Sequence, residues 1–254
     1  MEEYLATVQV ALEASKRIIS EHFRSGVEVE AKNDASPVTI ADRHAESAIR
    51  DVIARNHPEH AVLGEEHGAT VVSSPWKWVI DPIDGTKSFI SGMPTFGTLV
   101  ALTFEDKPLM GVIDMPMLNE RWIGVSGQGA KCNGEPCRVS SKEDLPEAIL
   151  YATEPNMFSE EQKLRFDALA GEVKLRRFGG DCYSYALLAS GFIDLVVEAS
   201  LQYYDVMALI PVVEEAGGII TDWRGNPIRE GWDGTVVAAA TASIHQQALA
   251  VLNR

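Results

Sequence analysis

A strand-like apolar run that ends in two carboxylates constrains the fold of this chain more than any other feature. Residues 76–80 are apolar apart from one lysine, and Asp81 and Asp84 follow them directly, three residues apart. Gly85 and Thr86 then lead into a segment typical of a helix start, where free N–H groups and the helix dipole attract an anion. We therefore expect a strand whose end holds two acids beside a place for a negatively charged group.

A second acidic pair follows another short apolar run. Glu65 and Glu66 come after residues 61–63, so two strand ends can direct their acids at one point. Carboxylate oxygens suit Mg²⁺ better than Zn²⁺, because Mg²⁺ binds through a few carboxylates, waters and a substrate phosphate. The pattern indicates a Mg²⁺ site that serves phosphate chemistry.

An ordinary turn explains part of the same pattern. Residues 81–85 also suit a turn, because proline presets φ, aspartate hydrogen-bonds locally and glycine accepts positive φ. Taken alone, these residues leave both interpretations open. The helix start that follows favours the metal site, because it would bring a metal and a phosphate to the same place.

Composition and charge narrow the class of protein. The chain has 254 residues, 46% of them hydrophobic, which is enough to bury a substantial core. Its 22 basic and 37 acidic residues give a net charge of −15, which argues against a nucleic-acid partner. No apolar run approaches the ~18 residues of a membrane-spanning helix, so we expect a cytoplasmic protein with no membrane contact.

Cysteines and histidines give no sign of a second metal site. Cys132, Cys137 and Cys182 are odd in number and lack a partner pair for a tetrahedral Zn²⁺ site, so we expect free thiols. The six histidines show no paired metal spacing, and we expect all of them to be structural or surface residues.

The first half of the chain has the pattern of helices packed over an antiparallel sheet. Helical spacing predicts one helix over 4–23 and a second that ends near residue 56, with Asp42 in its first turn. Strand patterns separated by turn residues fall near 27–31 and over 96–102, 109–114 and 121–125. We expect residues 1–145 to form an α+β half that carries the metal motif.

From about residue 146 strands and helices alternate, which suggests a more parallel α/β half, 146–254. No repeat or low-complexity linker separates the two halves, so we expect them to pack as one compact unit with a shared cleft. We expect strands over 149–152, 173–177 and 193–198. We expect helices over 160–170, 182–189, 205–215 and 244–252, the last capped by Ser243.

Four separated parts of the chain resemble signatures of the inositol monophosphatase superfamily. The matching residues are 78–86, 204–208 with 214–218, 32–42, and 64–66. The likeness extends over nearly the whole chain and implies the inositol monophosphatase (sugar phosphatase) fold, an α+β or α/β layered αβαβα sandwich. It also implies two or three Mg²⁺ ions per site, a small phosphorylated metabolite as substrate, and a homodimer.

The resemblance assigns the metal ligands residue by residue. The implied Mg²⁺ ligands are Glu65, Asp81, Asp84, Asp205 and the backbone carbonyl of Ile83. The residues alone had already grouped these acids, except Asp205, which a simple helix N-cap would also explain.

The resemblance also assigns the catalytic residues. It implies that Asp42 accepts a hydrogen bond from the Thr86 hydroxyl and that this pair orients the attacking water, with Glu65 as the third catalytic residue. From the residues alone, Asp42 would also be explained as a first-turn acid favoured by the helix dipole. The residues of this region that would contact the substrate are Asp84, Gly85, Thr86 and Asp205.

Residues 91–102 and 178–185 look more like the histidinol-phosphatase branch of the superfamily than like inositol phosphatases. Asp181 falls where inositol phosphatases carry a small residue, and with Glu198 it would contact the non-phosphate end of the substrate. Carboxylates there favour L-histidinol phosphate, which carries an ammonium group and an imidazole. Simpler roles are a helix cap for Asp181 and a solvated strand end for Glu198.

The resemblance thus implies a Mg²⁺-dependent phosphomonoesterase that converts L-histidinol phosphate to L-histidinol in histidine biosynthesis. Two other functions stay open. One is an inositol-1-monophosphatase or a broad-specificity phosphatase for sugar or nucleotide phosphates. The other is a non-catalytic sensor of a metabolite or metal, which the presence of every expected ligand argues against.

Overall fold

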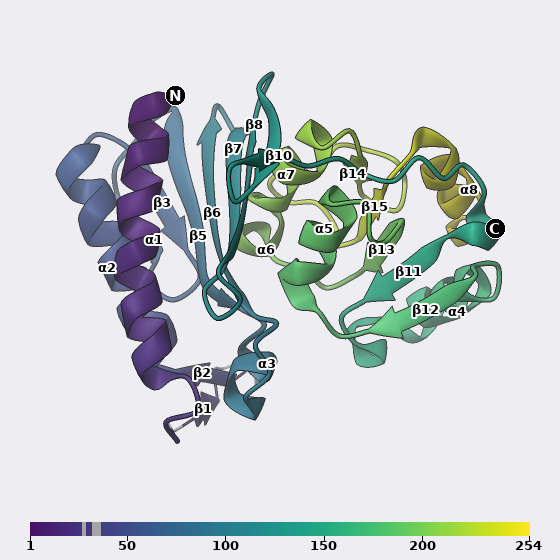
Figure 1. Cartoon of the computed structure of the whole chain (residues 1–254), viewed down its shortest axis with the longest axis horizontal. Coiled ribbons are helices and arrows are strands. Elements are labelled where there is room, and N and C mark those ends of the chain that lie inside the picture. The colour runs from purple at the N-terminus through teal and green to yellow at the C-terminus, as the bar shows by residue number, and fades with distance from the viewer. Residues whose placement is uncertain (27–28, 32–36) are drawn as a thin grey trace.

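Five layers make up the fold, in the order helices, sheet, helices, sheet, helices (Figure 1). The computed structural model describes residues 1–26, 29–31 and 37–254. The strand expected near 27–31 and the matching stretch 32–42 therefore lie partly outside the described residues. No helix in the described part of the chain is long and apolar enough to cross a membrane. The expected layered αβαβα fold is confirmed.

Helices α1 (Glu2–His22) and α2 (Ile40–Asn56) form the first outer layer and cover one face of the first sheet (Figure 1). Each presents an apolar stripe to the sheet, as its helical spacing predicts. Leu12 of α1 and Ile49 of α2 are fully buried in one cluster with Trp78 of the sheet. The outer layer therefore fixes where the first turn of α2 lies relative to the sheet.

The first sheet has eight strands in the order β10-β9-β8-β7-β6-β5-β3-β4. Every neighbouring pair is antiparallel except β3 and β5, which run parallel. Because parallel strands end at the same edge, the two acidic segments that follow the apolar runs meet there. The strands are β3 (Ala61–Gly64), β4 (Gly68–Ala69), β5 (Trp76–Asp84), β6 (Gly97–Phe104), β7 (Lys107–Met115), β8 (Glu120–Val125), β9 (Gly129–Cys132) and β10 (Glu135–Pro136).

The second sheet has five strands in the order β12-β11-β13-β15-β14. Its β11 pairs parallel with β12 and β13, whereas β15 pairs antiparallel with β13 and β14. The expected parallel character thus holds for one side of the sheet only, because β14 and β15 follow a helix and a long loop that reverse the chain. The strands are β11 (Ile149–Ala152), β12 (Leu175–Phe178), β13 (Leu195–Glu198), β14 (Ile219–Thr221) and β15 (Val236–Ala239).

The middle layer contains α5 (Asp181–Ala189), α6 (Tyr203–Val206) and α7 (Leu209–Glu215), which lie between the two sheets (Figure 1). The single helix expected over 205–215 is wrong, because the chain forms two short helices instead. Pro211 explains the break: it has no N–H, and its ring would clash with the carbonyl of residue 207 in a continuous helix.

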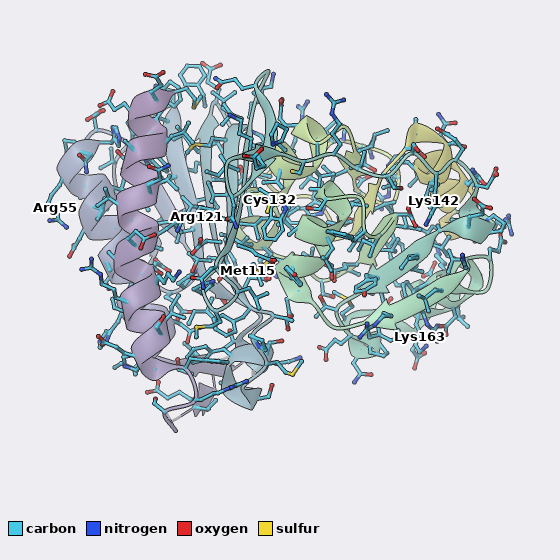
Figure 2. All side chains as sticks on the ribbon, in the orientation of Figure 1. Arg55, Met115, Arg121, Cys132, Lys142 and Lys163 are labelled. Atoms are coloured by element: carbon cyan, nitrogen blue, oxygen red, sulfur yellow. The ribbon has the colours of Figure 1, made fainter. Side chains whose placement is uncertain are left out.

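Two glycines let α7 lie directly on the first sheet. A Cβ atom on Gly111 of β7 would lie 2.0 Å from the carbonyl oxygen of Ala208. A Cβ atom on Gly124 of β8 would lie 2.2 Å from the carbonyl oxygen of Pro211. Figure 2 shows Met115 near this boundary, and its side chain is fully buried with those of the middle helices. The middle layer is therefore held tightly against the first sheet.

Helices α4 (Glu160–Ala170) and α8 (Ala242–Leu252) form the last layer. Figure 2 shows Lys163 of α4 and Arg55 of α2 on opposite outer layers. The expected Ser243 cap of the final helix is wrong, because Thr241 caps it by accepting from the Ile244 N–H. The remaining elements are β1 (Val29–Ala31), β2 (Pro37–Thr39), α3 (Thr86–Ser91) and the 3₁₀ turns Leu145–Glu147 and Pro155–Met157.

The chain passes from the first sheet to the second between β10 and β11. The division into halves at residue 145 remains a prediction. Cys132, Cys137 and Cys182 are free thiols, as expected.

Candidate metal and phosphate site

An irregular end of β5 brings two aspartates together. Residues three apart in a regular strand point to opposite faces, but the pairing of β5 with β6 shifts register between Asp81 and Asp84. Pro82 lies in this shift and has no N–H to offer a neighbouring strand. The Asp81 carboxylate accepts from the Ile83 N–H at 3.0 Å, and the Thr98 hydroxyl donates to the Pro82 carbonyl at 2.8 Å. These bonds hold the irregular segment in place.

Three carboxylates from distant parts of the chain meet at this strand end. One ligand oxygen from each of Asp81, Asp84 and Asp205 lies within 4.8 Å of the others. Asp205 is the third residue of α6, and its Oδ2 atom accepts from the Gln202 N–H at 2.7 Å in a capping box. The expected simpler role of Asp205 as the N-cap residue is therefore wrong, because Gln202 holds the cap position. Asp205 completes the capping box from the third helical position and also joins the cluster.

Glu65 lies at the same edge of the sheet. It directly follows β3, whose last residue, Gly64, lies opposite Ile80 in the parallel ladder with β5. The Glu65 N–H continues the pairing by donating to the Ile80 carbonyl at 3.2 Å. Its carboxylate lies close enough to Asp81 for its charge to raise the pKa of Asp81. Asp81, Asp84, Asp205 and Glu65 are called the acidic cluster below.

Crowding makes the acidic cluster costly to ionise without a cation. Burial raises the pKa of Asp81 well above its usual range, and the charges of Glu65, Asp84 and Asp205 raise it further. Burial also raises the pKa of Asp84 well above its usual range, helped by the charges of Asp181 and Asp205. A hard divalent cation would relieve this repulsion. The donors are oxygens only, so the residues present fit Mg²⁺.

Asp42 and Thr86 meet beside the cluster. The Asp42 Oδ2 atom accepts from the backbone N–H and the hydroxyl of Thr39, at 2.8 and 2.7 Å, and so caps α2. The Thr86 hydroxyl lies 3.4 Å from Asp42 Oδ1 and 3.2 Å from the carbonyl oxygen of Ile83. Burial raises the pKa of Asp42. Asp42 therefore completes the capping box in the first turn of α2 and also makes the contact with Thr86 that the resemblance implies.

The acidic turn is locked to the start of α5. Gly85 has φ of 88°, and a Cβ atom there would lie 2.8 Å from Asp181 Cγ, so only glycine fits without strain. The Ser88 hydroxyl donates to Asp181 Oδ2 at 2.8 Å. The Cys182 N–H donates to Asp84 Oδ2 at 2.6 Å. Residues about 95 positions apart in the chain are thereby held together at one site.

Asp181 does not cap α5. The cap position belongs to Gly180, which has no side chain to cap the helix. Asp181 is the first helical residue, with φ of 44°. The expected simpler role of Asp181 as a helix cap is therefore wrong. Its carboxylate contacts Ser88 instead, and burial raises its pKa.

One pocket joins the acidic cluster to the two carboxylates expected to bind the substrate body. Its lining includes Asp84, Thr153, Asp181, Tyr185, Glu198 and Asp205. The described geometry therefore brings the two sets of expected site residues to the same hollow.

Glu198 is buried rather than solvated. Its side chain accepts from the Thr153 N–H at 2.8 Å, the Thr153 hydroxyl at 2.6 Å and the Tyr185 hydroxyl at 2.7 Å. Burial raises its pKa. The simpler expectation of a solvated strand end is wrong, because β13 lies inside the second sheet, which helices cover on both faces (Figure 1).

A larger cavity of about 710 Å³ lies elsewhere, between the β6–β7 turn and α7. Its lining includes Asp106, Lys107, Ile210 and Glu214, and no member of the acidic cluster. Size alone therefore does not identify the site. The crowded carboxylates do, because they are the groups whose chemistry calls for a ligand.

A second set of possible metal ligands, His57, Glu59 and His60, has its ligand atoms within 4.8 Å of one another. An indole N–H can only donate, and that of Trp78 donates to His60 Nδ1 at 3.1 Å. The neutral His60 ring must then carry its proton on Nε2, which lies 3.3 Å from a Glu59 carboxylate oxygen. Neither ring nitrogen offers a lone pair to a metal, so His60 is structural, as expected.

Sequence reasoning missed several residues that shape the site. Ser88 could have been found, because it lies in the first turn of the helix that follows the acidic motif. Glu46 could also have been found, because it lies four residues after Asp42 and so on the same face of α2. Thr153 and Tyr185 gave no signal, because only the tertiary structure brings them to Glu198.

The whole chain is similar to known phosphatases. The sequence model of the inositol monophosphatase family matches residues 1–254. The bifunctional phosphatase IMPL2 of Arabidopsis thaliana, a chloroplastic protein, is 47% identical over 98% of this chain and 75% of its own length. A histidinol-phosphatase of Chlorobaculum parvum is 36% identical over 86% of this chain and 85% of its own.

The fold has a close match among solved structures. An inositol monophosphatase from Zymomonas mobilis superposes with a TM-score of 0.91 at 38% identity, covering 100% of this chain and 98% of that one. Similarity in sequence and in structure therefore point to the same family.

Proposed function

Since the chain belongs to the inositol monophosphatase family and is a phosphomonoesterase of that family, we propose that it hydrolyses L-histidinol phosphate to L-histidinol and phosphate with Mg²⁺. The observation that carries the metal-dependent chemistry is the meeting of three carboxylates within 4.8 Å beside Glu65. The observation that favours this substrate is the presence of Asp181 and Glu198 in the same pocket.

Glu65, Asp81, Asp84, Asp205 and the Ile83 carbonyl would hold two or three Mg²⁺ ions. Bound Mg²⁺ neutralises phosphate charge and lowers the pKa of a water molecule. Without it, the acidic cluster would repel a phosphate dianion, because the largest charges acting on Asp81 are other carboxylates. The site would therefore bind a phosphate substrate only when the cation is present.

Asp42 and Thr86 would orient the water that attacks phosphorus. The Thr86 hydroxyl donates toward Asp42 Oδ1 or the Ile83 carbonyl, and its lone pairs then accept a hydrogen bond from the water. In the reaction the water oxygen bonds to phosphorus, the bond from phosphorus to the alcohol oxygen breaks, and that oxygen leaves with a proton. Gly85 has no side chain, so the backbone there can approach the substrate closely. The residues that would contact the substrate are Asp84, Gly85, Thr86 and Asp205.

Asp181 and Glu198 would recognise the cationic body of L-histidinol phosphate. Both are held in place by hydroxyl donors, Ser88 for Asp181, and Thr153 and Tyr185 for Glu198. An ammonium group can pair with such fixed carboxylates, whereas the hydroxyls of inositol gain less from their charge. The similarity to the histidinol-phosphatase of Chlorobaculum parvum supports the same substrate.

A second candidate substrate is inositol 1-phosphate, or a wider range of sugar and nucleotide phosphates. The similarity to the Zymomonas mobilis inositol monophosphatase favours it. A non-catalytic sensor stays the weaker alternative, because every expected ligand is present at the site.

The test is phosphate release from L-histidinol phosphate by the purified protein, with Mg²⁺ and then with a chelator. We expect release that depends on Mg²⁺, and loss of release in Asp205→Asn. No release from any phosphomonoester would favour the sensor. The homodimer and the cytoplasmic location remain predictions, the first checked by the mass of the protein in solution.

A further inference from the structure

Glu46 of α2 is a buried carboxylate to which the reaction gives no role. Its side chain is fully shielded from solvent and pairs with the Arg50 guanidinium, one turn later, at 2.6 Å. A buried charge is retained only where it is paired and hydrogen-bonded, because its removal from water is costly. The other bonds of Glu46 therefore indicate what the charge is for.

Those bonds go to the loop that carries Glu65. The backbone N–H of Glu66 donates to Glu46 Oε2 at 2.6 Å, and that of His67 lies 3.2 Å from Glu46 Oε1. On the other side of Glu65, a Cβ atom on Gly64 would lie 2.1 Å from Glu46 Oε1. The carboxylate thus fills the space that a side chain at 64 would need, and touches the chain on both sides of Glu65.

Three neighbours of Glu46 on α2 hold the same loop. The Arg50 guanidinium donates to the carbonyl of Gly68. The His67 ring lies 3.0 Å from the Ser47 hydroxyl and 3.1 Å from the Arg43 carbonyl oxygen. The loop is therefore fixed to one face of a helix rather than carried on a free turn.

The same helix also carries Asp42, one turn before Glu46. Asp42 faces Thr86, so a single rigid element sets the place of the water-orienting pair and of the Glu65 loop. Residues that hydrogen-bond to the ligands of a metal fix the orientation of those ligands. Changing such residues commonly weakens metal binding about 10- to 100-fold.

We propose that Glu46 is a positioning residue that holds the backbone on either side of Glu65, so that the Glu65 carboxylate faces Asp81 and the metal. The inference rests on the metal site of the proposed function. It deepens that proposal, because it adds a residue that acts through Glu65 without touching metal or substrate.

The experiment compares Mn²⁺ binding, followed by electron paramagnetic resonance without substrate, in the wild-type protein and in Glu46→Gln. Glutamine keeps the size of the side chain but turns an N–H₂ group toward one of the two backbone N–H donors. We expect the Mn²⁺ dissociation constant to rise about 10- to 100-fold. The matched control is Glu161→Gln, which removes an i,i+4 partner of Arg165 on the distant helix α4 and should leave Mn²⁺ binding unchanged.

A second measurement reads the loop without any metal. Amide hydrogen exchange of residues 64–68 should be faster in metal-free Glu46→Gln than in the wild type, with no change in α8. A loss of global stability would speed exchange everywhere, so a local change separates positioning from folding.

Unchanged Mn²⁺ affinity in folded Glu46→Gln would overturn the role of Glu46 and leave the proposed function intact. Absence of Mn²⁺ binding in the wild type would instead sink the metal site itself. If Glu46→Gln does not fold, Gly64→Ala decides, because its Cβ would displace the Glu46 carboxylate. Weaker Mn²⁺ binding in Gly64→Ala supports the inference, and wild-type binding overturns it.

Discussion

The Ser88 hydroxyl donates a 2.8 Å hydrogen bond to Asp181 Oδ2, and this bond joins the helix after the acidic motif to the first residue of α5. The Asp181 carboxylate, which would bind the non-phosphate end of the substrate, is therefore oriented by the helix start that would lie beside the phosphate. In the proposed function, this contact would couple the residues at the two ends of the substrate.

Asp181→Asn tests the charge-based substrate preference. Asparagine can still accept from Ser88, so the main loss is the negative charge. We expect kcat/KM for L-histidinol phosphate to fall about 10- to 100-fold, since hydrogen bonds to charged groups contribute about 1.5 to 3 kcal/mol. The value for inositol 1-phosphate should change little. Equal losses on both substrates would contradict a role for the charge.

Thr86→Val tests the water-orienting pair. The change removes the hydroxyl and keeps the shape, so kcat should fall about 100- to 10,000-fold, the usual contribution of a positioned acid–base group, with little change in KM. Steady-state phosphate release measures both constants.

Thr39→Ala is the matched control for that pair. Thr39 caps α2 through Asp42 but does not contact the Thr86 hydroxyl, so the variant should lose about 1 kcal/mol of stability and retain most of kcat. A kcat loss in Thr39→Ala as large as that in Thr86→Val would indicate that helix capping, and not water orientation, explains both.

Asp81→Asn should stabilise the metal-free protein. Its carboxylate is buried among other anions, and asparagine still accepts from the Ile83 N–H. Because the pKa of Asp81 is raised in the folded state, ionising it at pH 8 costs folding free energy, and the neutral asparagine avoids that cost. Urea unfolding at pH 8 with a chelator should show a higher midpoint for the variant, which should also lose Mg²⁺-dependent activity. A lower midpoint would mean that the acidic cluster is not strained without metal.

The stability of the metal-free protein should depend on pH through the same residues. The pKa values of Asp81 and Asp84 are raised above 3.8, so the folded state binds more protons than the unfolded state between 3.8 and the raised values. Stability from these groups is thus full below pH 3.8 and is lost as pH rises through the raised pKa values. The slope reaches about 1.4 kcal/mol per pH unit for each carboxyl.

Urea unfolding across this pH range measures the effect. Comparison with Asp81→Asn isolates the contribution of Asp81 from that of all other carboxylates. Saturating Mg²⁺ should weaken the pH dependence of the wild-type unfolding free energy that Asp81 causes. A wild-type protein whose pH dependence matches that of Asp81→Asn would contradict the raised pKa of Asp81.

Much of the site could be predicted because its signals are local. Asp81, Asp84, Gly85 and Thr86 follow one strand directly, and their order along the chain already indicates a metal beside a helix start. Asp42 was placed correctly in the first turn of α2, because apolar spacing sets the helix and the cap follows.

Other features depend on contacts that the sequence does not encode locally. The spacing from Asp42 places Glu46 on the same face of α2, but Glu46 and Arg50 also have the spacing of an ordinary surface ion pair. Only the packing of α2 against the Glu65 loop shows that the Glu46 carboxylate is buried. Glu198 ends a short strand, and its burial follows from the helices that cover both faces of the second sheet.

The fold was predicted at the level of layers, and its errors have local causes. The helix expected over 205–215 divides because Pro211 cannot continue it, and the final helix is capped by Thr241 two residues before the expected Ser243. The second sheet is half parallel, because alternation of strands and helices stops after α7.

The most direct measurement of the central claim is steady-state phosphate release from L-histidinol phosphate and from inositol 1-phosphate, side by side, with Mg²⁺ and with chelator. We predict Mg²⁺-dependent release with kcat/KM about 100-fold higher for L-histidinol phosphate, equivalent to about 3 kcal/mol of differential transition-state binding. Comparable values for the two substrates would contradict the assigned substrate and favour a broad phosphatase.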